Sequence, residues 1–431
     1  MGNKGIILGA GIAGLSAGIA SGAEVFEGGP IPGGICASHY INPKGGRSFR
    51  GDDAESYRFE IGGGHWIFGA DAGILDFINS FSPVKSYKRR SSVYLPGIKS
   101  HIPYPIQNHL KYLPEDIRKK ALDEIINGKG GPVSTLADWL ELNFGRTLCE
   151  LFFFPFHELY TAGLYKETAP QDAFKSPVNK DLIVKGAEEN TKSVGYNAIF
   201  AYPAKGLDDL IRNMAKKCRI NFNKRVVKID VKSREIFFAD GKSTGYGDIV
   251  STLPLNRMIE MTGLDTGIPD PFTSVLVINI GALTGGMCPD EQWVYVPKSR
   301  AGFHRVGFYS NVDPSFLPVS SRADGGRVSI YVEKAYPGGK KPSDVEIQRV
   351  CDETVKELKE WSFISQAEVV DPTWIDVAYT WQRPHSSWVE EAIGQLKDYG
   401  IHQTGRYGRW KFQGIAESIK DGIDIKAALN G

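Results

Sequence analysis

The sequence has little of what marks secreted, metal-binding or membrane proteins. Its five cysteines are scattered and odd in number, and none forms a C-x-x-C pair, so neither a disulfide framework nor a metal site is predicted. No apolar run approaches the ~20 residues of a membrane span, and the apolar N-terminal stretch is broken by glycines, unlike a signal peptide. A net charge of +1 excludes a broad nucleic-acid-binding surface. We therefore expect a cytoplasmic protein with no metal, no nucleic-acid partner and no membrane span.

Glycine is abundant, by contrast, and the spacing of one cluster of glycines has a steric explanation. Residues 4–18 are typical of an apolar strand, a glycine turn and the start of a helix. Gly9 permits the tight turn, Gly11 lets the backbone approach a pyrophosphate, and Gly14 lets the helix pack closely on the strand. Ala13 lies at the start of this helix, whose N-terminal N–H groups can bind phosphate oxygens. The alternative is a glycine-rich turn in another kind of α/β domain.

An acidic residue follows at the distance that this pattern requires. A second strand over residues 23–27 ends at Glu27, a carboxylate placed to accept a hydrogen bond from a ribose hydroxyl. Glycines and prolines over residues 28–34, with Gly33 and Gly34 last, then form a loop that neither a helix nor a strand would tolerate. These features predict a dinucleotide-binding unit, and the second glycine loop is similar to the one that flavoproteins lay against FAD.

The length and patterning of the chain indicate how this unit is extended. At 431 residues the chain exceeds what one core usually holds, so roughly two or three lobes are expected. Residues from about 105 to 190 are mostly helical in pattern, whereas much of 272–335 alternates as strands do. We expect an α/β fold with a discontinuous Rossmann-like FAD-binding domain, a helical insert and an antiparallel β-sheet insert. The expected boundaries are 1–100, 196–255 and 391–431 for the FAD-binding domain, 101–195 for the helical domain and 256–390 for the β-sheet substrate domain.

Several short motifs agree in order and spacing with one family. They lie at residues 62–65 (Gly-Gly-Gly-His), 102–108, 195–200, 202–206, 293–297, 303–306 and 405–410. Together they resemble the UDP-galactopyranose mutase family, in particular its larger, eukaryotic-type branch, within the FAD-containing amine-oxidase-like flavoproteins. The resemblance covers nearly the whole chain.

The resemblance implies a flavin reaction without net redox change. Family members interconvert the pyranose and furanose forms of a nucleotide-diphosphate sugar. Reduced FAD attacks the anomeric carbon through N5 and expels UDP, and the N5–sugar adduct lets the ring open and reclose before UDP returns. The implied cofactors are FAD, active in its reduced form, and NAD(P)H as the reductant. The implied substrate is a UDP-sugar.

The resemblance also implies which residues hold the cofactor. His65 lies in the loop that in the family packs against the isoalloxazine ring and senses its redox state, and Gly64 precedes it. Val227 is expected to hold the adenine end through backbone contacts. Three more positions near the C-terminus are expected at the cofactor: Gly405, Arg406 and Ser418.

A pyrophosphate leaving group develops negative charge, so the site needs fixed cations. Arg305 and Arg406 match the family's phosphate-binding arginines, and a planar guanidinium suits phosphate well. With His65 they form the expected catalytic set. The alternative for either arginine is a surface ion pair.

Other substrate contacts are carried over position by position. Tyr104, Gln107 and Tyr295 can supply the flat partner and the amide that a uracil requires, although ordinary tyrosine packing is the alternative. Asn197 matches a family asparagine near substrate and flavin. Tyr379 matches a phosphate-contacting tyrosine.

The departures from the family pattern fall in the substrate site. His157 stands where the family has an asparagine near the uridine, and Tyr160 stands where it has a tryptophan. Phe412 replaces a phosphate-contacting tyrosine, and the Gly-Asn-x-Asp segment that follows is shortened to residues 414–417. The nucleotide half of the assignment is therefore stronger than the sugar half: another hexose, a deoxy sugar, a pentose or a thymidine nucleotide would fit as well.

Two other functions compete with the mutase. An oxidoreductase of the amine-oxidase or protoporphyrinogen-oxidase type would pass hydride from its substrate to oxidised FAD, and would need an apolar pocket rather than paired arginines. A flavin-binding protein without catalytic activity is the third alternative.

Overall fold

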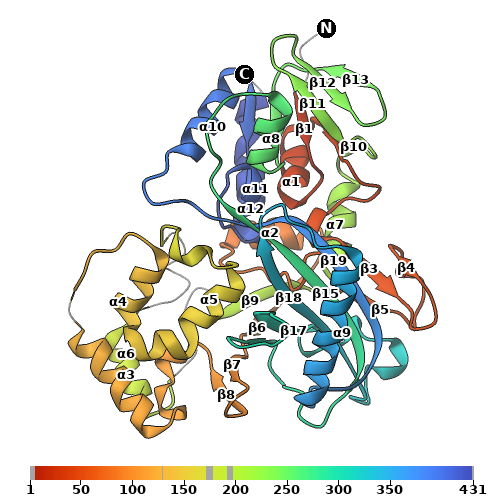
Figure 1. Ribbon diagram of the computed structural model, residues 1–431. Helices are drawn as coiled ribbons and strands as arrows, with labels where there is room; N and C mark the ends of the chain where they lie inside the picture. The colour runs from red at the N-terminus through yellow and green to blue at the C-terminus, as the bar shows by residue number, and fades with distance from the viewer. Residues whose placement is uncertain (1–4, 129, 171–177, 192–197, 430–431) are drawn as a thin grey trace.

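The computed structural model describes residues 5–128, 130–170, 178–191 and 198–429. Its fold is mixed α/β, as predicted. Figure 1 shows an upper part, which contains both the first strand and the last helix, and a lower part with a helical unit beside a large sheet. Among the described helices, none combines the length and apolarity that crossing a membrane would take.

A five-stranded parallel sheet forms the centre of the upper part. Its order is β10-β2-β1-β14-β20, and every neighbouring pair is parallel. Both faces of such a sheet must be covered, which explains the continuous apolar burial of its central strands. The strands are β1 (Ile6–Leu8), β2 (Glu24–Phe26), β10 (Arg219–Asn221), β14 (Ile249–Ser251) and β20 (Ile401–Gln403).

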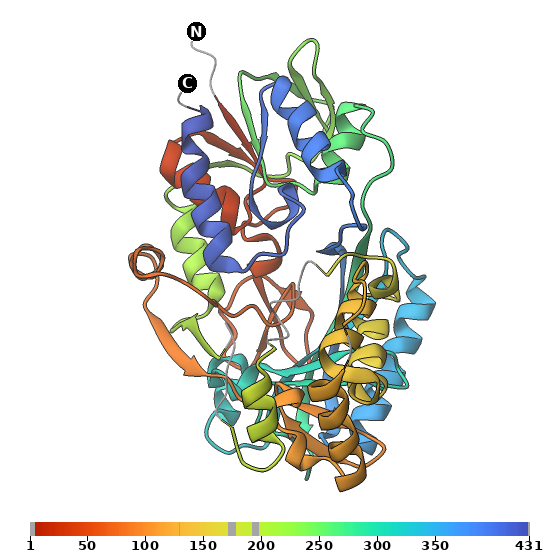
Figure 2. The same cartoon turned by 90° about the vertical axis from the view of Figure 1, so that its left-hand side faces the viewer.

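Helices from both ends of the chain cover this sheet. The last long helix packs along the first one (Figure 2). Gly422 makes this contact close, because a Cβ there would lie 2.3 Å from the carbonyl oxygen of Ala13. The helices of this part are α1 (Ile12–Ser21), α2 (Ala72–Asn79), α7 (Leu207–Ala215), α8 (Leu255–Thr262), α10 (Trp388–Asp398), α11 (Gly405–Gly408) and α12 (Ile415–Asp424).

Small antiparallel units accompany the two main sheets: β11, β12 and β13 lie beside the parallel sheet, and the other two units lie in the lower part (Figure 1). One three-stranded sheet has the order β11-β12-β13, a second has the order β4-β3-β5, and β6 pairs with β9. Their strands are β3 (Ser38–Ile41), β4 (Arg47–Ser48), β5 (Tyr57–Glu60), β6 (Val84–Lys88), β9 (Ile199–Pro203), β11 (Val226–Asp230), β12 (Glu235–Phe238) and β13 (Ser243–Gly245).

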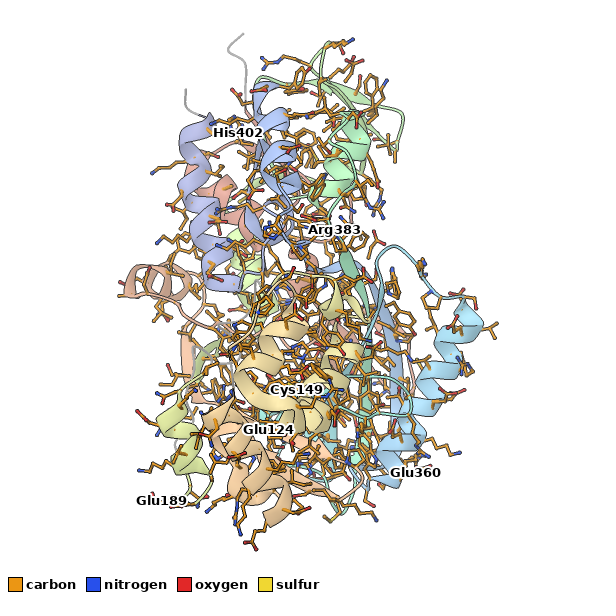
Figure 3. The ribbon with its side chains drawn as sticks, turned by 60° about the vertical axis from the view of Figure 1, so that its left-hand side comes forward. Glu124, Cys149, Glu189, Glu360, Arg383 and His402 are labelled. Atoms are coloured by element: carbon orange, nitrogen blue, oxygen red, sulfur yellow. The ribbon has the colours of Figure 1, made fainter. Side chains whose placement is uncertain are left out.

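The helical unit consists of α3 (Glu115–Asn127), α4 (Leu136–Leu148), α5 (Phe154–Tyr160) and α6 (Lys180–Gly186). A capping box between Thr135 and Asp138 starts α4. Near its end Gly145 adopts a φ of 71°, and there the Glu124 carboxylate accepts hydrogen bonds from the N–H and hydroxyl of Thr147. Figure 3 labels Glu124 and Cys149 inside this unit, and Arg383 where the upper and lower parts meet.

The large sheet of the lower part separates a hydrophobic core from the region that faces the upper part. Leu276, Ile278 and Ile280 alternate along β15 and pack toward α9 (Asp344–Glu360), whereas Val275 and Val277 point to the opposite face. The sheet order is β19-β15-β18-β17-β16-β7-β8. The strands are β7 (Ser91–Leu95), β8 (Ser100–Pro103), β15 (Phe272–Thr284), β16 (Trp293–Tyr295), β17 (Arg305–Phe308), β18 (Arg327–Pro337) and β19 (Ile364–Thr380).

Candidate functional site

A cavity of about 690 Å³ extends from the turn after β1, across the inner face of the large sheet, to the helical unit. Junctions between domains are the usual place for ligand sites. Most of the residues predicted from the sequence line this one cavity: Gly9, Gly11, Ala13, Glu27, Gly33, Gly34, Gly64, His65, Tyr104, His157, Tyr160, Tyr295, Arg305, Tyr379, Gly405, Arg406 and Ser418.

The turn between β1 and α1 has the geometry that its glycine spacing predicts. Gly9 has a φ of +96°, and a Cβ on it would lie 2.3 Å from Thr252 Oγ1. A Cβ on Gly14 would lie 1.9 Å from the carbonyl oxygen of Gly9, so helix and turn touch here. A Cβ on Gly11 would meet nothing within 4 Å, which leaves the backbone at the start of α1 open toward the cavity. This arrangement fits a pyrophosphate.

The carboxylate of Glu27 is fixed at the edge of the same cavity. Its Oε2 accepts a hydrogen bond from the N–H of Ala10 at 2.8 Å, and its Oε1 accepts one from the N–H of Gly29 at 2.7 Å. Each carboxylate oxygen has a further lone pair. Glu27 can therefore accept a hydrogen bond from a ribose hydroxyl without giving up its backbone partners.

The second glycine loop lies against the first. Gly33 donates its N–H to the carbonyl oxygen of Ala10 at 2.8 Å and forms a β-bridge with Gly11. Gly33 and Gly34 have positive φ values of 112° and 55°, which other residues rarely adopt. The two loops together make a backbone cradle of the kind that a dinucleotide requires.

His65 is held by its own loop. Its Nδ1 lies 2.9 Å from the carbonyl oxygen of Gly63, so Nδ1 carries the proton and Nε2 is the acceptor. Burial lowers the pKa of His65 to about 4, and the ring is neutral at pH 7. Gly64 has no room for a side chain, because a Cβ there would lie 2.4 Å from the hydroxyl of Tyr331.

The two predicted phosphate ligands differ in their surroundings. Arg305 forms an ion pair with Glu333, with Nη2–Oε1 at 2.5 Å and Nε–Oε2 at 3.0 Å. Its side chain is 23% exposed and that of Glu333 is 3% exposed, so the pair lies in the wall of the cavity rather than on the surface. Burial opposes ionisation of Glu333, but the charge of Arg305 and a contact with His304 outweigh it and lower the pKa of Glu333 to about 2.

Arg406 is held by neutral groups. It donates from Nη1 to the carbonyl oxygen of Gln413 and from Nη2 to that of Ala378, both at 3.0 Å. Its guanidinium lies 4.6 Å from the ring centre of Phe412 and 5.1 Å from that of Tyr379. Within the described part of the chain no carboxylate lies within 4 Å of it, so its charge is available to an anion.

Aromatic rings line the cavity between Arg406 and the helical unit. Tyr104 and Tyr295 have ring centres 4.6 Å apart, Phe156 lies 5.5 Å from Tyr295, and Tyr160 lies 4.8 Å from Tyr379. His157 donates from Nδ1 to the carbonyl oxygen of Phe153 at 2.7 Å within α5. The positions that depart from the family pattern therefore belong to the cavity wall.

Three of the predicted residues lie outside the cavity lining. Gly14 packs α1 onto the turn and does not line the cavity, and Gln107 is buried in a short 3-10 helix, η2 (Ile106–Asn108). Val227 is 51% exposed and also outside the lining, at a β-bulge in β11 that frees its backbone groups from the ladder. Asn197 lies outside the described residues. The ligand roles assigned to all four stay predictions.

Sequence reasoning missed some polar residues of the site. Glu333 alternates with buried apolar residues of β18, and a carboxylate at an inward position of a strand is a signal that could have marked it. His304, which lines the cavity, packs beside Tyr160 at 5.2 Å between ring centres. Glu60, buried behind the His65 loop, carried no sequence signal because its side-chain partner, Tyr202, comes from the distant strand β9.

No family model matches the sequence. The fold is that of a large group of solved structures which includes amine oxidases: cyclohexylamine oxidase from Brevibacterium oxydans is similar over 99% of this chain and 98% of that one, with a TM-score of 0.63 and 14% identity. An oxidoreductase from Methanosarcina mazei has a TM-score of 0.58 and 17% identity over 98% of this chain and 100% of its own.

Within this group the likeness is stronger to reduced UDP-galactopyranose mutase. The TM-score is 0.83 with 21% identity, over 99% of this chain and 93% of that one. The predicted likeness in fold to this mutase is therefore confirmed.

Proposed function

We propose that the chain is an FAD-dependent nucleotide-diphosphate-sugar mutase that interconverts the pyranose and furanose forms of a UDP-sugar, with NAD(P)H as the reductant. The observation that carries the proposal is the common cavity: Arg305 and Arg406 line the same space as the glycine cradle of Gly9 and Gly11. One cavity would thus hold both a dinucleotide, at the glycine cradle, and a second anion, at the arginines. The fold that contains it is shared with a UDP-galactopyranose mutase.

In this proposal the parallel sheet is the core of a discontinuous Rossmann-like FAD-binding domain. Its strands come from chain segments near residues 6, 24, 220, 250 and 402, which supports the segments 1–100, 196–255 and 391–431. The helices between residues 101 and 195 form the helical insert. Residues 256–390 supply most of the substrate-binding β-sheet insert, but β7 and β8 come from residues 91–103, before the expected boundary, and α8 at the start of 256–390 belongs to the upper part. A cytoplasmic location stays a prediction.

The residues of the cradle fit FAD. The open backbone at Gly11 and the N-terminus of α1 would hold the pyrophosphate, Glu27 the ribose, and the loop of Gly64 and His65 the ring system. Bound FAD in its reduced form would supply the nucleophile that attacks the anomeric carbon. His65, neutral at pH 7, would present Nε2 as a hydrogen-bond acceptor rather than a charge.

The two arginines bind and orient the pyrophosphate of the substrate. Arg406 offers a charge that no carboxylate among the described residues neutralises, while Arg305 is fixed in position by Glu333. Such preorganised cations stabilise a leaving diphosphate as its negative charge develops. Tyr104 and Tyr295 provide an aromatic wall suited to a nucleobase. Phe412, His157 and Tyr160 make the rest of the wall unlike the family pattern, which leaves the identity of the sugar open.

One observation favours a second function. The cavity is rich in aromatic rings where the helical unit meets it, including Phe152, Phe153 and Phe156, and an amine-oxidase-type oxidoreductase would use such an apolar pocket to hold its substrate. The mutase is the better supported of the two because an oxidoreductase of this type gives no reason for Arg406 to present an unneutralised charge.

Turnover under two redox conditions tests the proposal. The FAD-loaded protein is incubated anaerobically with a panel of UDP-pyranoses, with and without dithionite, and the products are separated by chromatography. The proposal expects a furanose product only with the reduced protein. Flavin bleaching of the oxidised protein by an amine, with no furanose product under either condition, would establish the oxidoreductase instead.

A further inference from the structure

A carboxyl group without a role in the chemistry above lies directly behind the His65 loop. Glu60, the last residue of β5, is fully buried. Its Oε2 accepts a hydrogen bond from the backbone N–H of His65 at 3.2 Å, and its Oε1 accepts one from the hydroxyl of Tyr202 at 2.5 Å. Glu60 does not line the cavity, but the loop that it holds does, at Gly62, Gly64 and His65.

The groups around Glu60 come from several elements. Arg58 on β5 donates to the Tyr202 hydroxyl at 3.4 Å. Asp208 of α7 lies close enough for its charge to act on both Arg58 and Glu60. On the other sides are Tyr309, whose hydroxyl donates to the Glu60 carbonyl oxygen at 3.4 Å, and Cys36 of a short 3-10 helix, η1 (Gly34–Cys36). Burial raises the pKa of Glu60 to about 8, although Tyr202, Arg58 and the N–H of His65 all act to lower it. One charged partner, Arg58, is thus near the carboxyl without touching it.

In this position the charge of Glu60 can affect groups in the cavity in two ways. An ionised carboxylate binds the His65 N–H more strongly than a protonated one does, so the proton on Glu60 changes how firmly the loop is held. In a water-free interior a negative charge also acts over longer range than in solvent. The Glu60 carboxylate lies behind the backbone of the His65 loop, which lines the cavity. Its negative charge therefore opposes the arrival of a second negative charge inside the cavity.

We propose that Glu60 is a positioning residue that takes up a proton when the flavin in this cavity is reduced. A two-electron reductant such as NAD(P)H or dithionite converts FAD to the anionic FADH⁻, which uses two electrons and one proton. The Glu60 carboxylate takes a second proton from solvent and becomes a neutral acid, while its hydrogen-bonded loop stays against the flavin. The inference rests on the FAD site of the proposed function and not on its substrate.

The number of protons taken up per two electrons tests the inference. The midpoint potential of the FAD-loaded protein is measured against pH between about 6 and 10, with wild type and Glu60→Gln. In wild type we expect one proton per two electrons at neutral pH, where Glu60 is already protonated, then a range above about pH 8 in which two protons accompany two electrons, and one proton again at still higher pH. In Glu60→Gln we expect one proton throughout, with a potential above that of wild type at alkaline pH and equal to it at acid pH.

A matched control is available elsewhere in the molecule. Glu368 likewise accepts a hydrogen bond from a tyrosine, Tyr57, at 2.5 Å, and it does not line the cavity. Glu368→Gln should leave the proton number of wild type unchanged.

The pH dependence of the wild-type midpoint potential tests the inference even if Glu60→Gln does not fold. A wild-type protein that takes up one proton per two electrons at every pH overturns the inference, and so does a folded Glu60→Gln protein with the wild-type curve. Either result leaves UDP binding and turnover intact, so it does not touch the mutase proposal. A protein that binds no FAD overturns both.

Discussion

Arg305 and Glu333 are direct cross-strand partners in the antiparallel pair β17–β18, and their side chains form an ion pair in the wall of the cavity. The pair holds a predicted phosphate ligand, Arg305, against β18, one of the long strands of the large sheet. Because both residues stand on regular strands, the guanidinium is aimed by the sheet rather than by a loop. The carboxylate both fixes Arg305 and reduces the net positive charge that it offers to a substrate.

Loss of the Glu333 charge should destabilise the protein in a pH-dependent way. The pKa of Glu333 is about 2 in the fold, below its ordinary value of 4.5. A carboxyl group with a depressed pKa contributes stability above its unfolded pKa, and this contribution is lost as the pH falls through the folded pKa. Glu333→Gln should therefore unfold about 1–3 kcal/mol more easily than wild type at pH 7.

Urea unfolding at pH 7 and at several pH values between 4.5 and 2 measures this effect. The gap between wild type and Glu333→Gln should shrink between pH 4.5 and pH 2, when the wild-type carboxylate takes up its proton. A gap that stays constant down to pH 2 would show that the charge of Glu333 is not what stabilises the fold.

Arg406→Ala should weaken UDP binding by about 10–100-fold, as expected for one lost charge-assisted contact. Arg409→Ala is the matched control, because Arg409 lies in the same turn of chain but is paired with Asp421 and does not line the cavity. Calorimetric titration with UDP compares the two. Equal affinity of Arg406→Ala and wild type would remove Arg406 from the phosphate site.

Gly11→Val should abolish FAD binding without unfolding the chain. The added side chain would extend into open space beside the start of α1, where the pyrophosphate is expected. Gly97→Val serves as control, since a Cβ on Gly97 also meets nothing within 4 Å but lies in the turn between β7 and β8. The visible absorbance of the purified proteins reports FAD content. A yellow Gly11→Val protein would place the cofactor elsewhere.

Phe412→Tyr should tighten UDP binding by about tenfold or more, because it adds a hydroxyl donor beside the guanidinium of Arg406. Phe154→Tyr is a fair comparison: Phe154 also packs on an arginine, Arg146, but away from the cavity. Unchanged affinity in the Phe412→Tyr protein would mean that this ring does not face the diphosphate.

The sequence predicted best what depends on short-range sterics. The roles of Gly9, Gly11 and Gly14 follow from contacts within one strand–turn–helix unit, and the structure places all three as expected. The presence of His65 and the two arginines in one cavity was also predicted, but through resemblance rather than through pattern.

Contacts between distant segments could not be predicted. The parallel sheet includes β20, whose sequence Ile-His-Gln lacks the apolar run that marks β1. The Arg305–Glu333 pair depends on strand register, and the partners of Glu60 depend on how β5, β9 and the His65 loop come together. A single sequence carries no signal for such pairings.

Binding of UDP to the FAD-loaded protein, in its oxidised and its dithionite-reduced state, shows whether the cavity holds a nucleotide-diphosphate sugar. We expect micromolar affinity by calorimetry, with tighter binding in the reduced state. No detectable binding in either state would contradict a nucleotide-diphosphate-sugar site and leave the charges of Arg305 and Arg406 without a ligand.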